Sequence, residues 1–349
     1  VGGIEVFRNG IAEIQEKWDC PVSLYTLNDR FRISVLPDQE LARELAAEAR
    51  AVQMDDDGSA ALRGAKPADG LVFPAFGNPR WEDFFINDII QMQRDTGCQI
   101  VYMDVMPRFS HLRGYNGISP REDDMNVVTR VRDALPADVA LWSEYPFTDV
   151  ASQYADGCIE YYFFTLHETF ARRYNASDRA DDLFMEMPMS IGRYALPRYR
   201  RVGLPVYIQA DNKPGQVDAI FVNGEVFHED TWHLHHSRIR ERINRAYVVK
   251  HQYTDCFSTE DPMPHVETAA SGITANLFPA QSRNLWTVYN GRPKTYSGIV
   301  LRVPHRDGAT YRDAWNDVAL TPSIHNGIAE ISLTIDPQRP GCVVQEWGR

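Results

Sequence analysis

The chain has 349 residues, of which 44% are hydrophobic and 24% are charged, and its formal net charge is −12. This length suits one large domain with a small accessory domain, and the composition is that of a folded globular protein rather than a disordered one. The negative charge argues against a broad nucleic-acid-binding surface. The sequence has no apolar run of about 18 residues, so no membrane-spanning helix is predicted.

Apolar runs alternate with amphipathic helical patterns over the first 270 residues, which predicts β/α units and a parallel sheet. The predicted strands are residues 21–26, 71–76, 99–104, 139–143, 158–163, 205–209 and 264–268. The predicted helices, with apolar residues three and four positions apart, are 4–18, 40–54, 81–96, 124–135 and 237–252.

We therefore predict an α/β fold, a TIM-type (β/α)8 barrel over residues 1–270. Seven strands fall one short of the eight that close such a barrel, so we expect the first strand, or a domain that carries it, upstream of Val1 in the same protein. On this count residues 99–104 are strand four, 139–143 strand five and 205–209 strand seven. Residues 55–70, rich in Asp, Gly and Ala, are expected to form a long loop.

The pattern changes after residue 270 to short alternating strands separated by turns. These strands are predicted at residues 285–289, 298–303, 329–335 and 342–345. Because no helical periodicity separates them, we predict a small antiparallel β-sandwich over residues 271–349.

Two acidic residues end consecutive predicted strands, Asp104 after residues 99–103 and Glu144 after residues 139–143. The carboxyl ends of parallel strands meet at the mouth of a barrel, so these two carboxylates are the predicted catalytic pair. Glycosidic cleavage uses one carboxyl group as a proton donor and another to attack or stabilise the anomeric carbon. The alternatives are a helix cap or salt bridge for Asp104, and an ion pair with an arginine for Glu144.

A third acid, Asp211, follows the predicted strand 205–209 and is expected to hydrogen-bond sugar hydroxyls, although a turn with Asn212 and Lys213 is equally compatible with its position. Aromatic and polar side chains near the strand ends are predicted to line a sugar subsite. These candidate substrate-binding residues are Tyr25, Asn28, Asp29, Phe76, Asn78, Trp81, Arg108, His111, Trp142, Tyr145, Tyr162 and His167.

Other chemistries have weaker support. The histidines His228, His233, His235 and His236 invite a metal site, but their spacing does not match a zinc signature such as His-Glu-x-x-His. The sequence contains no dinucleotide, Walker, serine-hydrolase or Cys-x-x-Cys motif, and its five scattered cysteines suit buried thiols rather than a disulfide framework. We therefore predict neither a metal nor a cofactor.

Three segments, FPAFGNPRW (73–81), GCQIVYMD (97–104) and WSEYP (142–146), resemble bacterial glycosidase-type barrels, including uncharacterised ones. These barrels are related to the endo-α-N-acetylgalactosaminidases of glycoside hydrolase family 101 and, more distantly, to the α-amylase clan. The segments NLWTVYN (284–290) and GATYRDAW (308–315) resemble the β-sandwich that follows such barrels.

In those enzymes the nucleophile is an Asp that closes strand four and the acid/base is a Glu that closes strand five, which implies these roles for Asp104 and Glu144. The α-amylase clan also has an Asp after strand seven, which corresponds to Asp211. This chain departs from the clan at Tyr102, where the clan has an Arg two positions before its nucleophile.

The resemblance implies a retaining glycoside hydrolase whose carbohydrate substrate is an α-linked glycoside, for example of galactose type. Two alternatives stay open, a non-catalytic carbohydrate-binding barrel and a metal-dependent hydrolase that uses the histidines. The chain shows no retained signal peptide, so both a cytoplasmic location and export with a removed signal fit the sequence.

Overall fold

The structure is a computed structural model that divides into two compact units, Val1–Ile159 and Glu160–Arg349. The predicted domain boundary at residues 270 and 271 falls inside the second unit and stays a prediction. The structure describes residues 3–27, 31–34, 36–53, 71–72, 74, 77–107, 118–162, 189–205, 214–228 and 237–348.

The first unit contains a parallel sheet. Its strands are hydrogen-bonded in the order β1 (Ser23–Leu27), β4 (Ile100–Asp104), β5 (Ala140–Ser143) and β6 (Gly157–Tyr162), the last of which crosses into the second unit. Alternate residues of β1, β4 and β5 are buried, as expected when one face of each strand packs into a core. The buried residues are Leu24, Thr26, Val101, Met103, Leu141 and Ser143.

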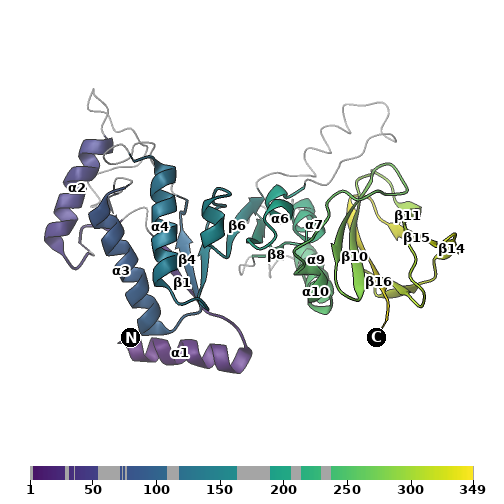
Figure 1. The fold of residues 1–349 in the computed structure, drawn as a ribbon, viewed down its shortest axis with the longest axis horizontal. Coiled ribbons are helices and arrows are strands. Elements are labelled where there is room, and N and C mark those ends of the chain that lie inside the picture. The colour runs from purple at the N-terminus through teal and green to yellow at the C-terminus, as the bar shows by residue number, and fades with distance from the viewer. Residues whose placement is uncertain are drawn as a thin grey trace. The chain divides into compact units, whose positions relative to one another are not determined.

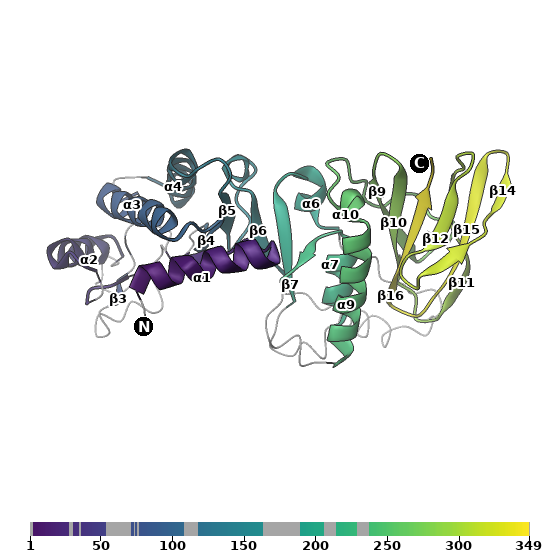
Figure 2. The same cartoon turned by 90° about the horizontal axis from the view of Figure 1, so that it is seen from below.

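All five predicted helices are present, four of them in the first unit: α1 (Gly3–Trp18), α2 (Gln39–Gln53), α3 (Pro79–Thr96) and α4 (Pro120–Ala134). A short 3-10 helix, η3 (Ala151–Tyr154), packs beside α4. The helix α4 begins with a capping box, in which Ser119 and Glu122 satisfy each other's backbone N–H groups. Figures 1 and 2 show α3 and α4 side by side along the strands.

Only part of the predicted strand at residues 71–76 is described. Its first two residues form β3 (Leu71–Val72), which pairs antiparallel with β2 (Phe31–Arg32) rather than in parallel. In the first unit's parallel sheet, β1 lies directly beside β4.

Two further strand predictions need correction. Residues 264–268 are not a strand, since only Met263 forms an isolated bridge with Leu277, and Pro262 and Pro264 lack the N–H groups that a ladder requires. The predicted strand 205–209 begins earlier, as β7 (Arg200–Pro205), and residues 206–213 lie outside the described part of the chain.

In the second unit, β7 pairs in parallel with the short strand β8 (Val226–Phe227). Its helices are α6 (Ile191–Ala195), α7 (Pro214–Val222), α9 (Ser237–Gln252) and α10 (Thr254–Phe257). Within the described residues, no helix is long and apolar enough to cross a membrane.

Eight strands make up the C-terminal part of this unit, and they form two antiparallel sheets with the orders β13-β12-β16-β10-β9 and β11-β15-β14. The strands are β9 (Ile273–Pro279), β10 (Arg283–Asn290), β11 (Tyr296–Pro304), β12 (Thr310–Asp313), β13 (Val318–Leu320), β14 (Ser323–His325), β15 (Ile328–Ile335) and β16 (Arg339–Glu346). One shared core joins the sheets, so the antiparallel β structure predicted after residue 270 is present.

The five-stranded sheet is buried on both faces. Successive side chains of β10 point to opposite faces, and each face packs into a different core. Trp286 and Val288 belong to the core shared with the other sheet, whereas Leu285 and Tyr289 pack with residues of α7, α9 and α10. Both figures show these helices beside β10. Gly224, with φ +72°, follows α7 where a Cβ would lie 2.5 Å from the Phe278 ring, so only glycine fits.

Candidate active site

An aromatic row crosses one face of the first unit's parallel sheet. The register pairs Tyr25 with Tyr102, and Tyr102 with Trp142. Asp104 lies two residues beyond Tyr102, and Glu144 two residues beyond Trp142. Because side chains two residues apart in a strand share a face, Asp104 lies on the face of this row at the carboxyl end of β4, and Glu144 directly follows the last residue of β5.

Hydrogen bonds join the two strand ends beyond the sheet itself. The Glu144 N–H donates to the Met103 carbonyl over 3.1 Å, so the parallel ladder continues to the position of Glu144. The Val105 N–H donates to Glu144 Oε2 over 2.7 Å, and the Tyr145 N–H donates to the Met106 carbonyl over 2.8 Å. Glu144 is therefore bound to the residue that directly follows Asp104.

Val105 has a backbone conformation that is unfavourable for a β-branched residue. Its φ of 55° lies in the left-handed region, where such side chains are rare and where the strain is about 1–3 kcal/mol. This conformation occurs at the residue whose N–H holds the Glu144 carboxylate. Strain of this kind is concentrated at functional sites, which agrees with an active site at the end of β4.

Tyr25 connects the aromatic row to Asp104. Its hydroxyl donates a hydrogen bond to Asp104 Oδ2, and its ring centroid lies 5.8 Å from that of Tyr102. The side chain is 62% exposed, so it borders solvent while it orients the carboxylate.

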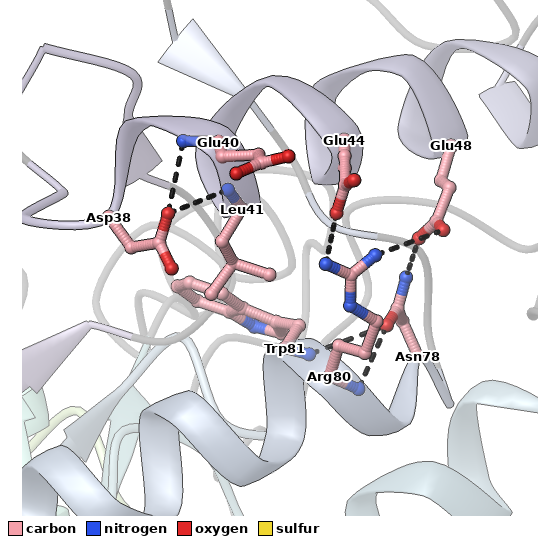
Figure 3. Close-up of polar contacts among 8 residues, drawn as sticks. All are labelled: Asp38, Glu40, Leu41, Glu44, Glu48, Asn78, Arg80 and Trp81. Atoms are coloured by element: carbon pink, nitrogen blue, oxygen red, sulfur yellow. Dashed lines mark hydrogen bonds and ion pairs between the residues drawn. The ribbon is translucent and has the colours of Figure 1, made fainter.

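Asn78 and Trp81, both predicted to bind substrate, have structural partners at the start of α3 (Figure 3). Asn78 is 2% exposed, accepts hydrogen bonds from the backbone N–H groups of Arg80 and Trp81, and donates to Glu48 of α2. Trp81 is buried, and its ring is stacked 5.1 Å from Phe31. These contacts do not support a substrate role for either residue, and that role stays a prediction.

Two more predicted substrate-binding residues, Trp142 and Tyr145, are half-buried and belong to the strand end that carries Glu144. The side chain of Tyr162 is not described. The remaining candidates lie outside the described residues: Asn28, Asp29, Phe76, Arg108, His111, His167 and Asp211.

The predicted histidine cluster is mostly outside the described part of the chain, which includes only His228 of the four. Within the described residues, no three His, Cys, Asp or Glu side chains are grouped as metal ligands. The sequence interpretation missed the Val105 N–H, which no side-chain pattern could reveal. It also missed the hydrogen bond from Tyr25 to Asp104. The two-residue spacing of Tyr102 and Asp104 does indicate that a tyrosine and the acid share one face of the strand.

No protein-family model matches the chain, and no curated protein matches its sequence significantly. Solved structures do match its fold. An Anoxybacillus α-amylase shares 12% identity with a TM-score of 0.60, over 100% of this chain and 80% of its own. The α-amylase of Geobacillus thermoleovorans complexed with acarbose shares 11% identity with a TM-score of 0.62, over 99% and 81%.

A debranching enzyme from Nostoc punctiforme shares 13% identity with a TM-score of 0.60, over 97% of this chain and 79% of its own. The fold is of the α-amylase type. The sequence predicted a relation to the α-amylase clan, as the more distant of two predicted relations. The relation predicted to the endo-α-N-acetylgalactosaminidases is not supported, since these similar structures are amylases and a debranching enzyme.

Proposed function

We propose that this chain is a glycoside hydrolase that cleaves an α-linked glycoside with retention of configuration. The observation that supports the proposal is that Asp104 ends β4 and Glu144 follows the neighbouring strand β5, with the Val105 N–H bound to Glu144. Adjacent strands lie about 4.8 Å apart, a spacing compatible with the carboxyl separation of about 5 Å in retaining enzymes. The amylase-type fold favours an α-linked substrate.

In the proposed reaction Asp104 attacks the anomeric carbon and forms a glycosyl ester while Glu144 protonates the departing glycosidic oxygen. The Glu144 carboxylate then takes a proton from water, and the resulting hydroxide displaces Asp104 from the sugar. Two inversions at the anomeric carbon return the original configuration. Both residues end the cycle in their starting protonation states.

The other predicted residues have supporting roles in this proposal. Asp211 hydrogen-bonds sugar hydroxyls and strengthens those contacts in the transition state. Trp142 and Tyr145 bind the sugar beside Glu144, and Tyr25 orients Asp104. Further proposed sugar contacts come from Asp29, Phe76, Arg108, His111 and His167.

A non-catalytic carbohydrate-binding protein is the second candidate. The observation that favours it is the 62% exposed Tyr25 in the aromatic row of the first unit, since an aromatic side chain at the surface can stack on a sugar without cleavage. Binding of sugars without cleavage would distinguish this candidate from the enzyme.

Hydrolysis of a panel of α- and β-linked aryl glycosides by the full chain tests the proposal. We expect one α-linked substrate to be cleaved, and Asp104→Asn and Glu144→Gln each to lower kcat by several orders of magnitude, because each removes a group that acts in the transition state. Glu16→Gln, an exposed carboxylate on α1, is the matched control and should retain activity. NMR detection of the α-anomer as first product would establish retention.

If the panel shows no cleavage, or if the Asp104 and Glu144 variants cleave as fast as the parent chain, the glycosidase proposal is wrong.

A further inference from the structure

Lys250 lies on the side of α9 that faces the core of the second unit. Ile243 and Ala246 precede it by seven and four positions, Tyr253 follows it by three, and all three are buried in that core. Residues at these spacings share one side of a helix. Lys250 is half-buried, and its Nζ lies 4.3 Å from the centroid of the Phe257 ring. A lysine therefore occupies a position where the pattern of α9 favours an apolar residue.

A second cation is buried in the same place. Arg193 of α6 is 2% exposed, and its Nη2 donates a hydrogen bond of 2.9 Å to the carbonyl of Phe257, the residue whose ring Lys250 contacts. The guanidinium carbon of Arg193 lies 5.6 Å from the ring centroid of Phe278, and the Phe257 and Phe278 rings are 5.3 Å apart. The two cations thus share one aromatic environment within the core.

One carboxylate acts on both of these cations. Glu225 follows α7, is 1% exposed and accepts a hydrogen bond from the Ser190 hydroxyl. Its charge raises the pKa values of both Arg193 and Lys250. A buried charge is costly unless it is paired, so a single carboxylate leaves one of the two cations without compensation.

The lysine is the cation that can respond by losing its proton, since an arginine stays protonated in proteins. Burial, and after it the nearby Arg193 charge, lowers the pKa of Lys250 to about 7, although Glu225 opposes the shift. About half of the Lys250 side chains are then neutral at pH 7. A neutral amine is a nucleophile, whereas an ammonium group is not.

Two buried donors close to this amine have no acceptor among the residues that the structure describes. They are Arg193 Nη1 and the hydroxyl of the adjacent Tyr194. The Tyr194 ring lies 6.5 Å from Phe278, the same ring that Arg193 contacts. Buried donors without a partner are unfavourable, so an acceptor group formed at Lys250 would be stabilised here.

We propose that Lys250 is a carbamylation site, at which its neutral amine combines with carbon dioxide. The nitrogen attacks the carbon of carbon dioxide, an N–C bond forms, and the electron pair of one C=O π bond moves to oxygen. One proton leaves the nitrogen for solvent, so the product is a carbamate with a single negative charge. Its oxygens accept hydrogen bonds from Arg193, and a bond between opposite charges is stronger than a neutral one.

The charges around Lys250 favour such an anion. The charged and titratable groups that act on Lys250 and Arg193 are Arg193, Tyr194, Arg200, Glu225 and Cys342. Burial raises the pKa values of the phenol and the thiol in this set, so both stay neutral. Two guanidinium groups and one carboxylate remain, and a carbamate makes the positive and negative charges equal, as a buried site favours.

Carbon-13 NMR of the full chain with labelled bicarbonate tests this proposal, at about pH 8 where an amine of pKa about 7 is mostly neutral. We expect a carbamate resonance that is present in the parent and absent in Lys250→Met. The α-amino group of the chain forms a carbamate of its own, so the readout is the resonance that Lys250→Met removes. Lys17→Met, at an exposed position of α1, is the matched control and should keep that resonance.

A second variant tests the partner of the carbamate. Arg193→Met should lower the amount of the Lys250 carbamate about tenfold or more at a given bicarbonate concentration, because it removes a hydrogen bond between opposite charges. Arg198→Met is its control, since the Arg198 side chain is 82% exposed and pairs with Glu260 instead. The control should carry as much carbamate as the parent.

A measurement on the parent chain alone keeps the proposal testable if a variant does not fold. Ethylation with a trialkyloxonium salt traps carbamates as stable carbamate esters, and peptide mass spectrometry then identifies the modified lysine. We expect the trapped group on Lys250. Its absence there at saturating bicarbonate, or equal NMR spectra for the parent and Lys250→Met, would overturn the proposal.

Discussion

The Tyr25 hydroxyl donates a hydrogen bond to Asp104, and it comes from a neighbouring strand rather than from β4 itself. The residue two positions before Asp104 on the same strand is Tyr102, which is neutral. We therefore treat Tyr25 as a residue that positions the proposed nucleophile.

Tyr25→Phe removes only this hydroxyl. If the glycosidase proposal holds, we expect kcat/KM to fall about tenfold, since a hydrogen bond to a charged group is worth about 1.5–3 kcal/mol when buried and less in an exposed setting. The loss should fall on kcat more than on KM, because the hydrogen bond orients the attacking oxygen. Tyr154→Phe, in η3, is the control. Equal losses in both variants, or a loss confined to KM, would contradict the positioning role.

At the scale of elements, the start of α3 shows why a polar residue beside a predicted strand end need not bind substrate. Asn78 caps the helix and joins it to α2 through Glu48, while Arg80 pairs with Glu44 and lies 3.9 Å from Glu48. These contacts fix the packing of α2 against α3 (Figure 3).

Asn78→Ala should lower the free energy of unfolding by about 1–2 kcal/mol, the usual effect of losing an N-cap, with the buried bond to Glu48 at the upper end. Urea denaturation of the full chain measures this change. Asn9→Ala, at an exposed position of α1, should stay within about 0.5 kcal/mol of the parent. Unchanged stability together with a raised KM would show instead that Asn78 contacts the substrate.

At the scale of the whole molecule, a buried ion pair makes stability depend on pH. Asp218 of α7 is 1% exposed and pairs with Arg242 of α9, and its Oδ1 has no hydrogen-bond partner among the residues that the structure describes. Burial raises the pKa of Asp218 to about 7, because desolvation outweighs the attraction and hydrogen bond of Arg242. The unfolded chain loses this proton near pH 3.8, whereas the folded chain keeps it until about pH 7.

The free energy of unfolding should therefore fall as pH rises between these two values and level off above pH 7. Asp218→Asn removes the effect, so the parent should lose stability relative to this variant from pH 5 to 7 in urea denaturation. The exposed Asp261→Asn serves as the control and should follow the parent. Parallel pH profiles for the parent and Asp218→Asn would refute the assignment.

Local sequence patterns were enough to predict the helices α1, α2, α3, α4 and α9, because helical periodicity and caps involve residues within four positions of one another. The same local patterns singled out Asp104 and Glu144 as catalytic candidates, which stay predictions. Four of the eight antiparallel strands after residue 270 were predicted from alternation along each strand, namely β10, β11, β15 and β16. The shorter strands β12, β13 and β14, and also β9, were not.

Strand partners and register were decided only by the tertiary structure. β3 pairs with β2, and β1 pairs with β4, although the paired segments lie far apart in the sequence. No local pattern distinguishes a strand of a short antiparallel pair from a strand of the parallel sheet. The same register brings Tyr25 to Asp104 across 79 positions and the Val105 N–H to Glu144 across 39. Such contacts depend on how the whole chain buries its apolar faces, which no segment specifies alone.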